Sequence, residues 1–370
     1  MKIKEVCTYA PKSNIKAGDA TIDGPYRFFT SSEDESKRYK EYLFDGEGII
    51  MGTGGSATLH YYNGKYAVST DCVVILPNDK LRCKYLYYFF LANYSTLEAG
   101  FKGSGLKHTS KGYIGDIEIA VIPTLEEQDI IIHVLDKAFD LIRSHNQELD
   151  LLNTFIKARF FEMFGDPKCN PNHYPVVPFA NLVEYMGDIG SNGANKVIVE
   201  HLDMKYEEDY ALMVRFLNFT KNDFVQDVKY ISKESYDFFK KSQLFGGELI
   251  ICKIGSAGLN YVMPHLNRPV SLGLNQIMVR ITDNVLMPYL YQYLHTGYGE
   301  YLISGCINGA VTKSITKTEL KKIPIVLPPM KRQLLFVEFI DQIDKTKSVI
   351  QSALAKAQLL FNSLMQQYFG

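Results

Sequence analysis

Tryptophan is absent from this 370-residue chain, and no stretch approaches the roughly 20 consecutive apolar residues that a membrane-spanning helix needs. The N-terminal residues MKIKEVCTYAPKSN lack the apolar run of a secretory signal peptide. The six cysteines form no Cys-x-x-Cys pair, which argues against a disulfide framework and against a structural zinc site. We therefore expect a cytoplasmic protein with reduced, mostly buried thiols, no bound metal and no membrane contact.

Signatures of the common enzyme classes are absent as well. Asn63-Gly64-Lys65-Tyr66 has neither the glycine spacing of a phosphate-binding loop nor a Ser or Thr after its lysine. The chain also has no Gly-x-Gly-x-x-Gly between a strand and a helix, no His-Glu-x-x-His and no Gly-x-Ser-x-Gly. Pro328-Pro329 begins a helix and does not belong to the Asn/Asp-Pro-Pro-aromatic motif of DNA methyltransferases. We predict no catalytic residue, and no cofactor bound by this chain.

The distribution of acidic residues along the chain is more informative than the net charge. The formal net charge of -1 gives no broad basic surface for a nucleic acid. However, no acidic residue occurs in four windows, 48–70, 99–115, 249–282 and 301–318, which occupy matching places in the two halves of the chain. These windows supply cations for phosphates, amides and hydroxyls for base edges, and glycines for close approach of a backbone. They predict a DNA-binding surface in each half.

The candidate DNA contacts come from these windows and from one arginine that precedes each set. In the first half they are Arg27, Ser56, His60, Tyr61, Lys65, Lys102, Lys107, His108 and Ser110. In the second half they are Arg215, Lys253, Ser256, Asn260, Tyr261, Arg268, Asn308, Thr312 and Lys313. Each residue taken singly also fits a solvated loop. Arg27 and Arg215 fit guanine recognition and equally an ion pair with a nearby acid such as Glu33 or Asp209.

An internal repeat sets the domain organisation. Residues 119–165 align without a gap on residues 324–370, so that Gln128 falls on Gln333 and the ending Phe164-Gly165 on Phe369-Gly370. Upstream, Gly55-Ser56-Ala57 matches Gly255-Ser256-Ala257. The chain is therefore two copies of a β-leaning domain followed by a long helix. We place the domains at residues 1–122 and 167–327, and the helices at 123–166 and 328–370.

The helices have marked starts and a heptad pattern. Each follows an expected strand (Ile117 to Val121; Ile323 to Leu327) and a proline, and Thr124 with Glu127 has capping-box spacing. A helix from Leu125 to Phe164 would be ~60 Å long. Sustained heptads predict an antiparallel coiled coil about a pseudo-twofold axis in an α+β protein, and the alternative is two separate helices that each cap their own domain. The positions expected to pair are Ile131, Leu135, Ile142, Leu149, Leu152 and Ile156 with Phe336, Ile340, Ile343, Ile350, Leu354 and Phe361.

Taken together, these features resemble the specificity subunit of type I restriction-modification systems over essentially the whole chain. The resemblance rests on the strand-Pro-x-x-x-x-Gln helix starts (Ile122 to Gln128 and Leu327 to Gln333), on the Phe-Gly helix ends and on the Gly247–Ala257 segment. The first copy of that segment is weaker, with Gly46-Glu47-Gly48-Ile49-Ile50. Such subunits perform no chemistry themselves.

The resemblance implies that each domain reads one half of a split double-stranded DNA target through the major groove, and that the helices set the number of base pairs between the halves. It also implies two methyltransferase subunits, which bring S-adenosylmethionine and modify adenine N6, and restriction subunits that use ATP and magnesium. The main rival hypothesis is a structural adaptor whose duplicated domains bind protein or glycan. The third hypothesis is that the chain is itself an enzyme.

Overall fold

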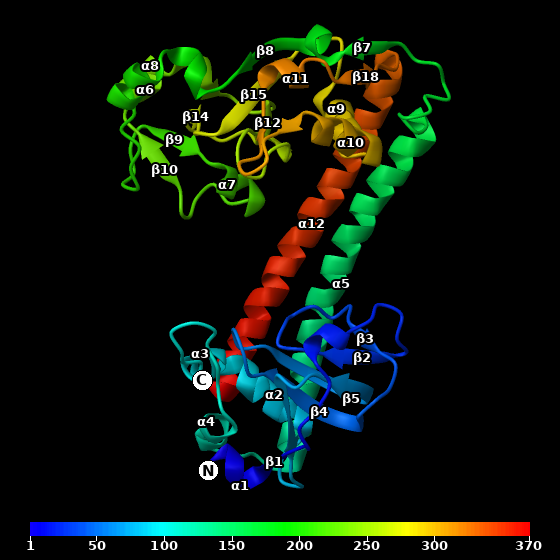
Figure 1. Cartoon of the computed structure of the whole chain (residues 1–370), viewed down its shortest axis with the longest axis vertical. Helices are drawn as coiled ribbons and strands as arrows, with labels where there is room; N and C mark the ends of the chain where they lie inside the picture. Colours follow the sequence, from blue (N-terminus) through cyan, green and yellow to red (C-terminus); the bar gives the residue numbers. More distant parts are fainter. The chain divides into compact units, whose positions relative to one another are not determined.

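The computed structural model describes residues 1–370, which divide into two compact units (Figure 1). Unit 1 contains Met1–Glu148 and Ile350–Gly370, and unit 2 contains Leu149–Val349. Each unit holds one domain of mixed helices and strands together with part of each long helix. The α+β class and the duplicated organisation predicted from the sequence are thus confirmed. No helix combines the length and the apolar character that would let it cross a membrane.

Unit 1 is built on a single six-stranded sheet. Its strands lie in the order β1-β6-β4-β5-β2-β3, and all neighbours are antiparallel except β2 and β5. The elements of its domain are α1 (Ile3–Val6), β1 (Cys7–Tyr9), η1 (Ala17–Asp19), β2 (Tyr26–Phe29), β3 (Arg38–Tyr39), β4 (Phe44–Gly52), β5 (Leu59–Val68), β6 (Cys72–Pro77), α2 (Cys83–Ala92), α3 (Tyr94–Ala99) and α4 (Lys111–Asp116).

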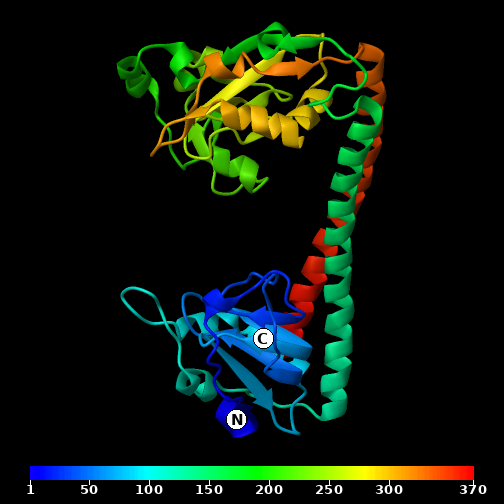
Figure 2. The same cartoon turned by 45° about the vertical axis from the view of Figure 1, so that its right-hand side comes forward.

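Both faces of this sheet are buried. Side chains alternate along β4, so that Ile49 and Met51 face a core shared with α2 and the long helices, while Ile50 faces a second core with Phe29 and Tyr66. Helix α2 covers the first face and in turn contacts the long helix that follows the domain, which Figure 2 shows beside the sheet. The domain is therefore fixed to the helix through α2.

Unit 2 contains the same plan with a divided sheet. Two four-stranded sheets have the orders β10-β9-β14-β11 and β13-β12-β15-β8. The elements of its domain are β7 (Val176–Pro178), η2 (Phe179–Leu182), β8 (Val183–Gly187), η3 (Ile189–Asn192), α6 (Asn195–His201), β9 (Ala211–Val214), α7 (Phe216–Thr220), β10 (Lys229–Ile231), α8 (Lys233–Phe238), η4 (Lys240–Ser242), β11 (Gln243–Leu244), β12 (Leu249–Cys252), β13 (Asn260–Val262), β14 (Val270–Leu272), β15 (Gln276–Ile281), α9 (Met287–Leu294), α10 (Gly297–Gly305), β16 (Ile307–Asn308), β17 (Ser314–Ile315), α11 (Lys317–Leu320) and β18 (Pro324–Val326).

One long strand of unit 1 accounts for this difference. The continuous strand β5 corresponds to β13 and β14. Strands β5 and β13 each pair with the strand of their unit that contains Ile-Ile, which is β4 or β12, whereas β5 and β14 each pair in parallel with an earlier strand, which is β2 or β9. Pro264 and Pro269 lie between β13 and β14. Since proline has no N–H to donate to a ladder, the strand is interrupted there and the sheet divides in two.

The long helices α5 (Leu125–Phe164) and α12 (Met330–Phe369) pair in each unit. In unit 1 the first part of α5 meets the last part of α12, where the rings of Phe139 and Phe361 lie 6.0 Å apart. In unit 2 the last part of α5 meets the first part of α12, with Phe155 5.2 Å from Phe339 between ring centroids. The pairing is therefore antiparallel, as predicted, and both views show the helices side by side. The alternative of two separate helices is wrong.

All twelve side chains expected to pair are buried or half-buried. The heptad register omits Phe160 and Phe164, which are nevertheless fully or almost fully buried and pack against Phe336 of α12 and Tyr289 of α9. Near its end, α5 thus buries a wider face than a two-helix seam needs, because it contacts the domain of unit 2 as well as α12.

A fully buried glutamine ties each long helix to its own domain. In unit 1, Gln128 accepts a hydrogen bond from the backbone N–H of Arg82 (2.8 Å) and donates to the carbonyls of Lys80 (3.0 Å) and Pro123 (2.8 Å). In unit 2, Gln333 makes the matching bonds. These contacts give a physical reason for the Pro-x-x-x-x-Gln spacing: the glutamine satisfies backbone groups at the start of both the long helix and the domain helix.

The helix start at Thr124 has the predicted capping box, and the cysteines are as expected. The Glu127 N–H donates to Thr124 Oγ1 (3.3 Å), and the Thr124 N–H donates to the Glu127 carboxylate (2.8 Å). All six cysteines are free thiols, and only Cys169 is exposed.

One predicted strand is wrong. The segment Ile117 to Val121 forms only an isolated bridge between Lys2 and Glu118, while its counterpart is the strand β18, which pairs with β7. Because α1 begins at Ile3 and turns the chain away, the backbone bonds to this segment are limited to those of Met1 with Ile119 and of Ile3 with Ile117.

Candidate nucleic-acid interface

The first candidate surface is formed in unit 1 by two segments that lie far apart in sequence, residues 53–58 after β4 and residues 102–110 before α4. The Gly55 N–H donates to the carbonyl of Lys107 (2.8 Å), and the Thr109 N–H donates to that of Thr53 (3.0 Å). Gly55 has a φ of +88°, a conformation that glycine adopts without strain. We call these two segments the paired loops of unit 1.

Unit 2 repeats this arrangement with residues 253–258 and 308–316, the paired loops of unit 2. The Gly255 N–H donates to the carbonyl of Lys313 (3.3 Å), and the Ile315 N–H donates to that of Lys253 (3.0 Å). Gly255 has a φ of +87°, as its counterpart has in unit 1. The two loops therefore meet through the same backbone contacts in both copies.

Several predicted contacts gather on the paired loops. In unit 1 these are Ser56, Lys102, Lys107 and His108, all exposed, together with Ser110. The Ser110 hydroxyl accepts a bond from the Tyr113 N–H (3.2 Å) and so caps α4. In unit 2 they are Lys253, Ser256, Asn308, Thr312 and Lys313, of which only Lys253 is half-buried.

Other predicted contacts of unit 1 lie on the sheet instead. His60 and Tyr61 point to opposite faces of β5, since His60 packs on Phe29 (ring centroids 5.2 Å apart) and the Tyr61 hydroxyl donates to Glu47 (2.5 Å) beneath α2. Burial lowers the pKa of His60. For Tyr61, burial and the bond to Glu47 raise the pKa. The structure therefore does not bring these two residues together.

The basic residues of this sheet have partners. Arg27 forms an ion pair with Glu35 (3.1 Å), where the sequence suggested Glu33, and Lys65 lies 4.7 Å from the ring centre of Tyr42. These two side chains lie on the sheet and not on the paired loops.

In unit 2, four predicted contacts are held within the domain. Asn260 is buried, and Tyr261 stacks on Phe219 with ring centroids 5.6 Å apart. Arg268 forms an ion pair with Glu208 (3.3 Å) and covers the ring of Tyr230. Arg215 bonds to the backbone and carboxylate of Asp227, not to Asp209. These residues are not part of the paired loops.

The two arginines that precede the windows do not occupy equivalent places. On β2, Phe29 pairs with Val68 of β5, and on β9 Val214 pairs with Leu272 of β14. Since β5 corresponds to β13 and β14, Phe29 matches Val214. Arg27 therefore lies two residues before this reference position, and Arg215 lies one residue after it.

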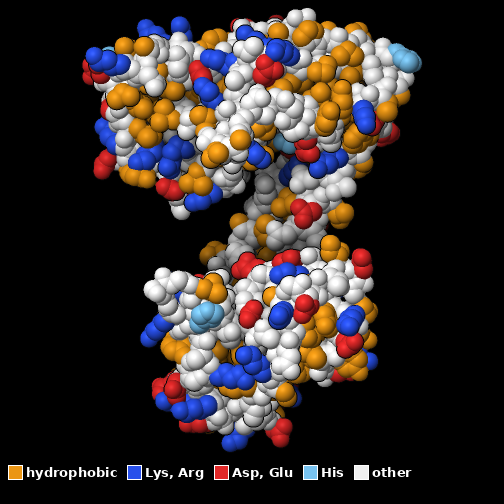
Figure 3. Space-filling view, in the orientation of Figure 1, with side chains coloured by type: hydrophobic (Ala, Val, Ile, Leu, Met, Phe, Trp, Pro, Cys, Tyr) orange, Lys and Arg blue, Asp and Glu red, His pale blue; other side chains and the backbone are white.

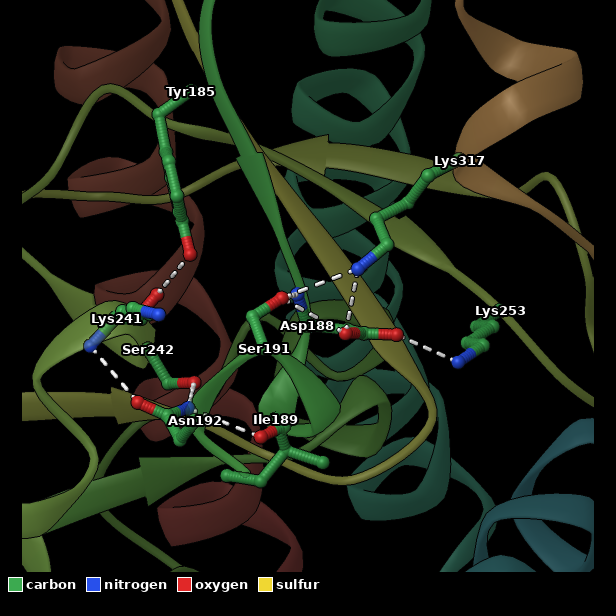
Figure 4. A network of polar contacts seen from close by, with 9 residues as sticks. All are labelled: Tyr185, Asp188, Ile189, Ser191, Asn192, Lys241, Ser242, Lys253 and Lys317. Carbon is green, nitrogen blue, oxygen red and sulfur yellow. Dashed lines mark hydrogen bonds and ion pairs between the residues drawn. The ribbon is translucent and has the colours of Figure 1, made fainter. Parts of the chain in front are cut away.

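The main residue that sequence reasoning missed is Asp188, which follows β8. Its side chain is only 8% exposed and binds two lysines, Lys253 at 2.6 Å and Lys317 at 2.9 Å (Figure 4). The Lys317 ammonium also donates to the hydroxyl of Ser191 (3.1 Å). Burial alone would raise the pKa of Asp188, but the bonds and charges of the two lysines outweigh it and lower the pKa to about 2. The carboxylate is therefore ionised at neutral pH.

The short helix η3 that carries Ser191 is itself fixed. The Asn192 side chain donates to Ser242 Oγ (2.7 Å) and accepts from the Lys241 N–H (3.0 Å), while the Tyr185 hydroxyl donates to the carbonyl of Lys241 (3.0 Å). Figure 4 shows these bonds beside those of Asp188 and its lysines, and the backbone of η3 connects the two sets. The backbone next to Asp188 is thus fixed by bonds that do not involve Lys253 or Lys317.

Unit 1 has no carboxylate at the matching place. The strand pairings put Gly187 opposite Met278 and Ala10 next to Val74, so that Pro11 takes the place of Asp188. A cavity of about 190 Å³ lies there, and its lining includes Lys12, Thr53 and Lys111. The two units therefore differ in whether a carboxylate contacts the paired loops.

The visible surface carries no single basic band. Figure 3 shows Lys and Arg side chains interspersed with acidic ones on each unit. No group of three or more His, Cys, Asp or Glu side chains is arranged to hold a metal ion. On this face the basic side chains therefore form local groups and no continuous band.

Comparison with known proteins places the chain in a family. The model of the type I restriction modification DNA specificity domain matches residues 1–154 and 187–358. The EcoDI specificity subunit of Escherichia coli is 22% identical, with 96% of this chain and 84% of that protein aligned. A putative type I restriction enzyme specificity subunit of Haemophilus influenzae is 24% identical over 85% of this chain and 80% of its own length.

A solved structure shows the same fold. The crystal structure of the type I restriction-modification system S subunit from M. genitalium aligns over 100% of this chain and 95% of its own, with a TM-score of 0.62 and 13% identity. That likeness concerns the fold alone. The family model covers most of the chain in two segments, one over each domain with its helix. The protein therefore belongs to the family of type I restriction-modification DNA specificity domains, the specificity subunits that the sequence resembles.

Proposed function

We propose that this chain is the non-catalytic subunit that selects the DNA target of a type I restriction-modification complex, and that each unit reads one half of a bipartite site. The observation that carries the proposal is the duplication of the paired loops, which meet through matching backbone bonds in both units. Two copies of one candidate surface are what a DNA target with two half-sites requires. Membership of a DNA specificity family supports the same function.

The chemistry of the paired loops suits a DNA groove. Lys107 and Lys313 occupy matching positions, and both are exposed. Hydroxyl and amide groups of Ser56, Ser256 and Asn308 lie in the same loops and offer donors and acceptors for base edges. Lysines that contact phosphates would fix the register, and the neutral polar groups would read sequence.

Exposed apolar side chains on the long helices support the docking of partner subunits there. Ile130 and Leu360 of unit 1 are 58% and 50% exposed, and their repeat counterparts, Leu335 and Phe155 of unit 2, are 45% and 53% exposed. Large apolar side chains that stay in water at matching positions indicate surfaces that another protein covers. We assign them to two methyltransferase subunits, which would bring S-adenosylmethionine and modify adenine N6. Restriction subunits that use ATP and magnesium would join the same complex.

The helices also offer a basis for the spacing between half-sites. Each has 40 residues without interruption, which corresponds to ~60 Å. We propose that this paired segment fixes the number of unspecified base pairs, which should be of the order of one helical turn of DNA, ~34 Å.

A binding selection tests the proposal. The full-length chain, co-expressed with the methyltransferase subunits of its host, is incubated with a pool of random DNA duplexes, and bound duplexes are sequenced. We expect one motif with two defined halves and a fixed gap. The variant Ser56→Ala should weaken selection of one half and Asn308→Ala that of the other, while Lys356→Gln on the exposed side of α12 should leave both unchanged. Enrichment of no motif, as an adaptor for protein or glycan would give, contradicts the proposal.

A further inference from the structure

We propose that Asp188 is a positioning residue for DNA binding by unit 2: it holds the ammonium groups of Lys253 and Lys317 side by side so that both contact one stretch of DNA backbone. This inference rests on the proposed function. Asp188 would thus support DNA binding although it does not contact DNA and its negative charge repels the DNA backbone.

The geometry leaves both lysines with donors to spare. Lys253 uses one N–H on the carboxylate of Asp188, and Lys317 uses two, on Asp188 and on Ser191. An ammonium has three donors, so three N–H groups of the pair remain free. The two side chains are 36% and 35% exposed, whereas that of Asp188 is 8% exposed. The free donors therefore face solvent while the carboxylate does not.

The charge balance favours an anion over a closed internal pair. Two lysines around one carboxylate leave a net charge of one positive unit, and the acid-free windows provide no second carboxylate to neutralise it. A phosphate oxygen placed between the ammonium groups would complete both hydrogen-bond sets. Lysine alone is a flexible point charge, so fixing two of them beforehand reduces the entropy lost when DNA binds.

The position in the fold points the same way. Lys253 begins one of the paired loops of unit 2, and Lys317 follows directly after the other. Asp188 thus ties together the two segments that carry the predicted DNA contacts. Its own position is fixed from behind by η3, through the bonds of Asn192 to Ser242 and Lys241.

Unit 1 provides an internal comparison. There Lys111 takes the place of Lys317 in the first turn of its helix, and lies 5.0 Å from the ring centre of Tyr9, with proline at the place of Asp188. Unit 1 thus presents a lysine without a carboxylate clamp. The inference therefore concerns only the half-site that unit 2 reads.

The test measures DNA affinity against salt. The probe is a duplex selected by the wild-type complex from the random pool, and binding is followed by fluorescence anisotropy from about 50 mM to about 200 mM KCl. Lys253→Gln and Lys317→Gln should each weaken binding about tenfold and reduce the slope of log affinity against log salt by about one. Asp188→Asn should also weaken binding by about tenfold and reduce the slope, although it removes a negative charge near DNA.

The sign of the Asp188→Asn effect decides the matter. Simple electrostatics predicts tighter binding when a carboxylate is removed, so binding that is unchanged or tighter overturns the inference, as does an unaltered salt slope for both lysine variants. The matched control Asp203→Asn removes a carboxylate of the same unit that holds Ser232 and Ser235, and it should leave the slope unchanged.

Two further readouts keep the outcomes separate. If Asp188→Asn does not fold, the partly exposed lysine variants and their double variant still test phosphate contact. Substitutions in the half-site of unit 1 should affect wild type and all variants equally. Failure of the wild-type complex to select any DNA sequence would refute the proposed function itself, whereas selection with intact salt slopes refutes only the role of Asp188 and its lysines.

Discussion

The buried glutamine at the start of each long helix provides the sharpest prediction of stability. Gln333 is completely buried, accepts a hydrogen bond from the Leu286 N–H (2.9 Å) and donates to the carbonyls of Pro328 (2.9 Å) and Asn284 (3.4 Å). Gln333→Ala removes all three bonds at once. It leaves one backbone N–H and two carbonyls without their partner inside unit 2.

The magnitude follows from these contacts. An unsatisfied buried donor costs about 1–3 kcal/mol, and the carbonyls and the cavity left by the side chain add to it. We therefore expect Gln333→Ala to lower the free energy of unfolding by about 3–5 kcal/mol. Gln342→Ala, an exposed glutamine of the same helix, should change it by less than about 0.5 kcal/mol.

Chemical unfolding with hydrogen exchange measures this effect. Urea titrations of the wild type, Gln333→Ala and Gln342→Ala give the change in stability, and mass spectrometry of exchanging amides locates it. Exchange should become faster at the start of α9, where Leu286 loses its acceptor, and remain unchanged in β4 of unit 1. A loss below about 1 kcal/mol, or equal loss in both glutamine variants, would refute the reasoning.

Three other predictions follow from the helices and from Asp188. Removing residues 144–147 and 349–352 together should shorten the preferred gap between half-sites, because each helix loses ~6 Å; an unchanged gap in the selected duplexes would refute the spacer hypothesis. Leu335→Glu and Leu360→Glu should each release one methyltransferase subunit without unfolding the chain, as native mass spectrometry would report; retention of both subunits contradicts the docking assignment. Since the folded pKa of Asp188 lies at about 2, below its usual value, its stabilisation of about 2 kcal/mol is present above about pH 4 and lost as the pH falls through 2, so the stability difference from Asp188→Asn should shrink over that range in urea titrations.

The architecture could be predicted because its signals are local or repeated. The limits of α5, Leu125–Phe164, follow from a proline, a capping box and a heptad pattern within one segment. Antiparallel pairing follows from the duplication. The repeat shows that Gln128 and Gln333 match, but it does not show what they bind. Their partners Arg82 and Leu286 lie 46 and 47 residues away in sequence.

The candidate site could be predicted only in part, for the same reason. Acid-free windows found the paired loops, since composition is a local property. They did not separate His60 from Tyr61, which point to opposite faces of β5. Alternation along a strand predicts that neighbouring side chains lie on opposite faces of the sheet, but it does not say which face would bind DNA. The bonds of Asp188 to Lys253 and Lys317 span 65 and 129 residues, and no spacing within the chain signals such a contact.

The most direct test of the account is the adenine methylation that this chain directs. The chain and its methyltransferase subunits are expressed in a host that lacks them, and N6-methyladenine is mapped across the genome. We predict a single motif with two separated halves, in which Asn308→Ala relaxes one half and Ser56→Ala the other. A contiguous motif, or a motif that persists when this chain is omitted, would contradict the claim that its two units select the target.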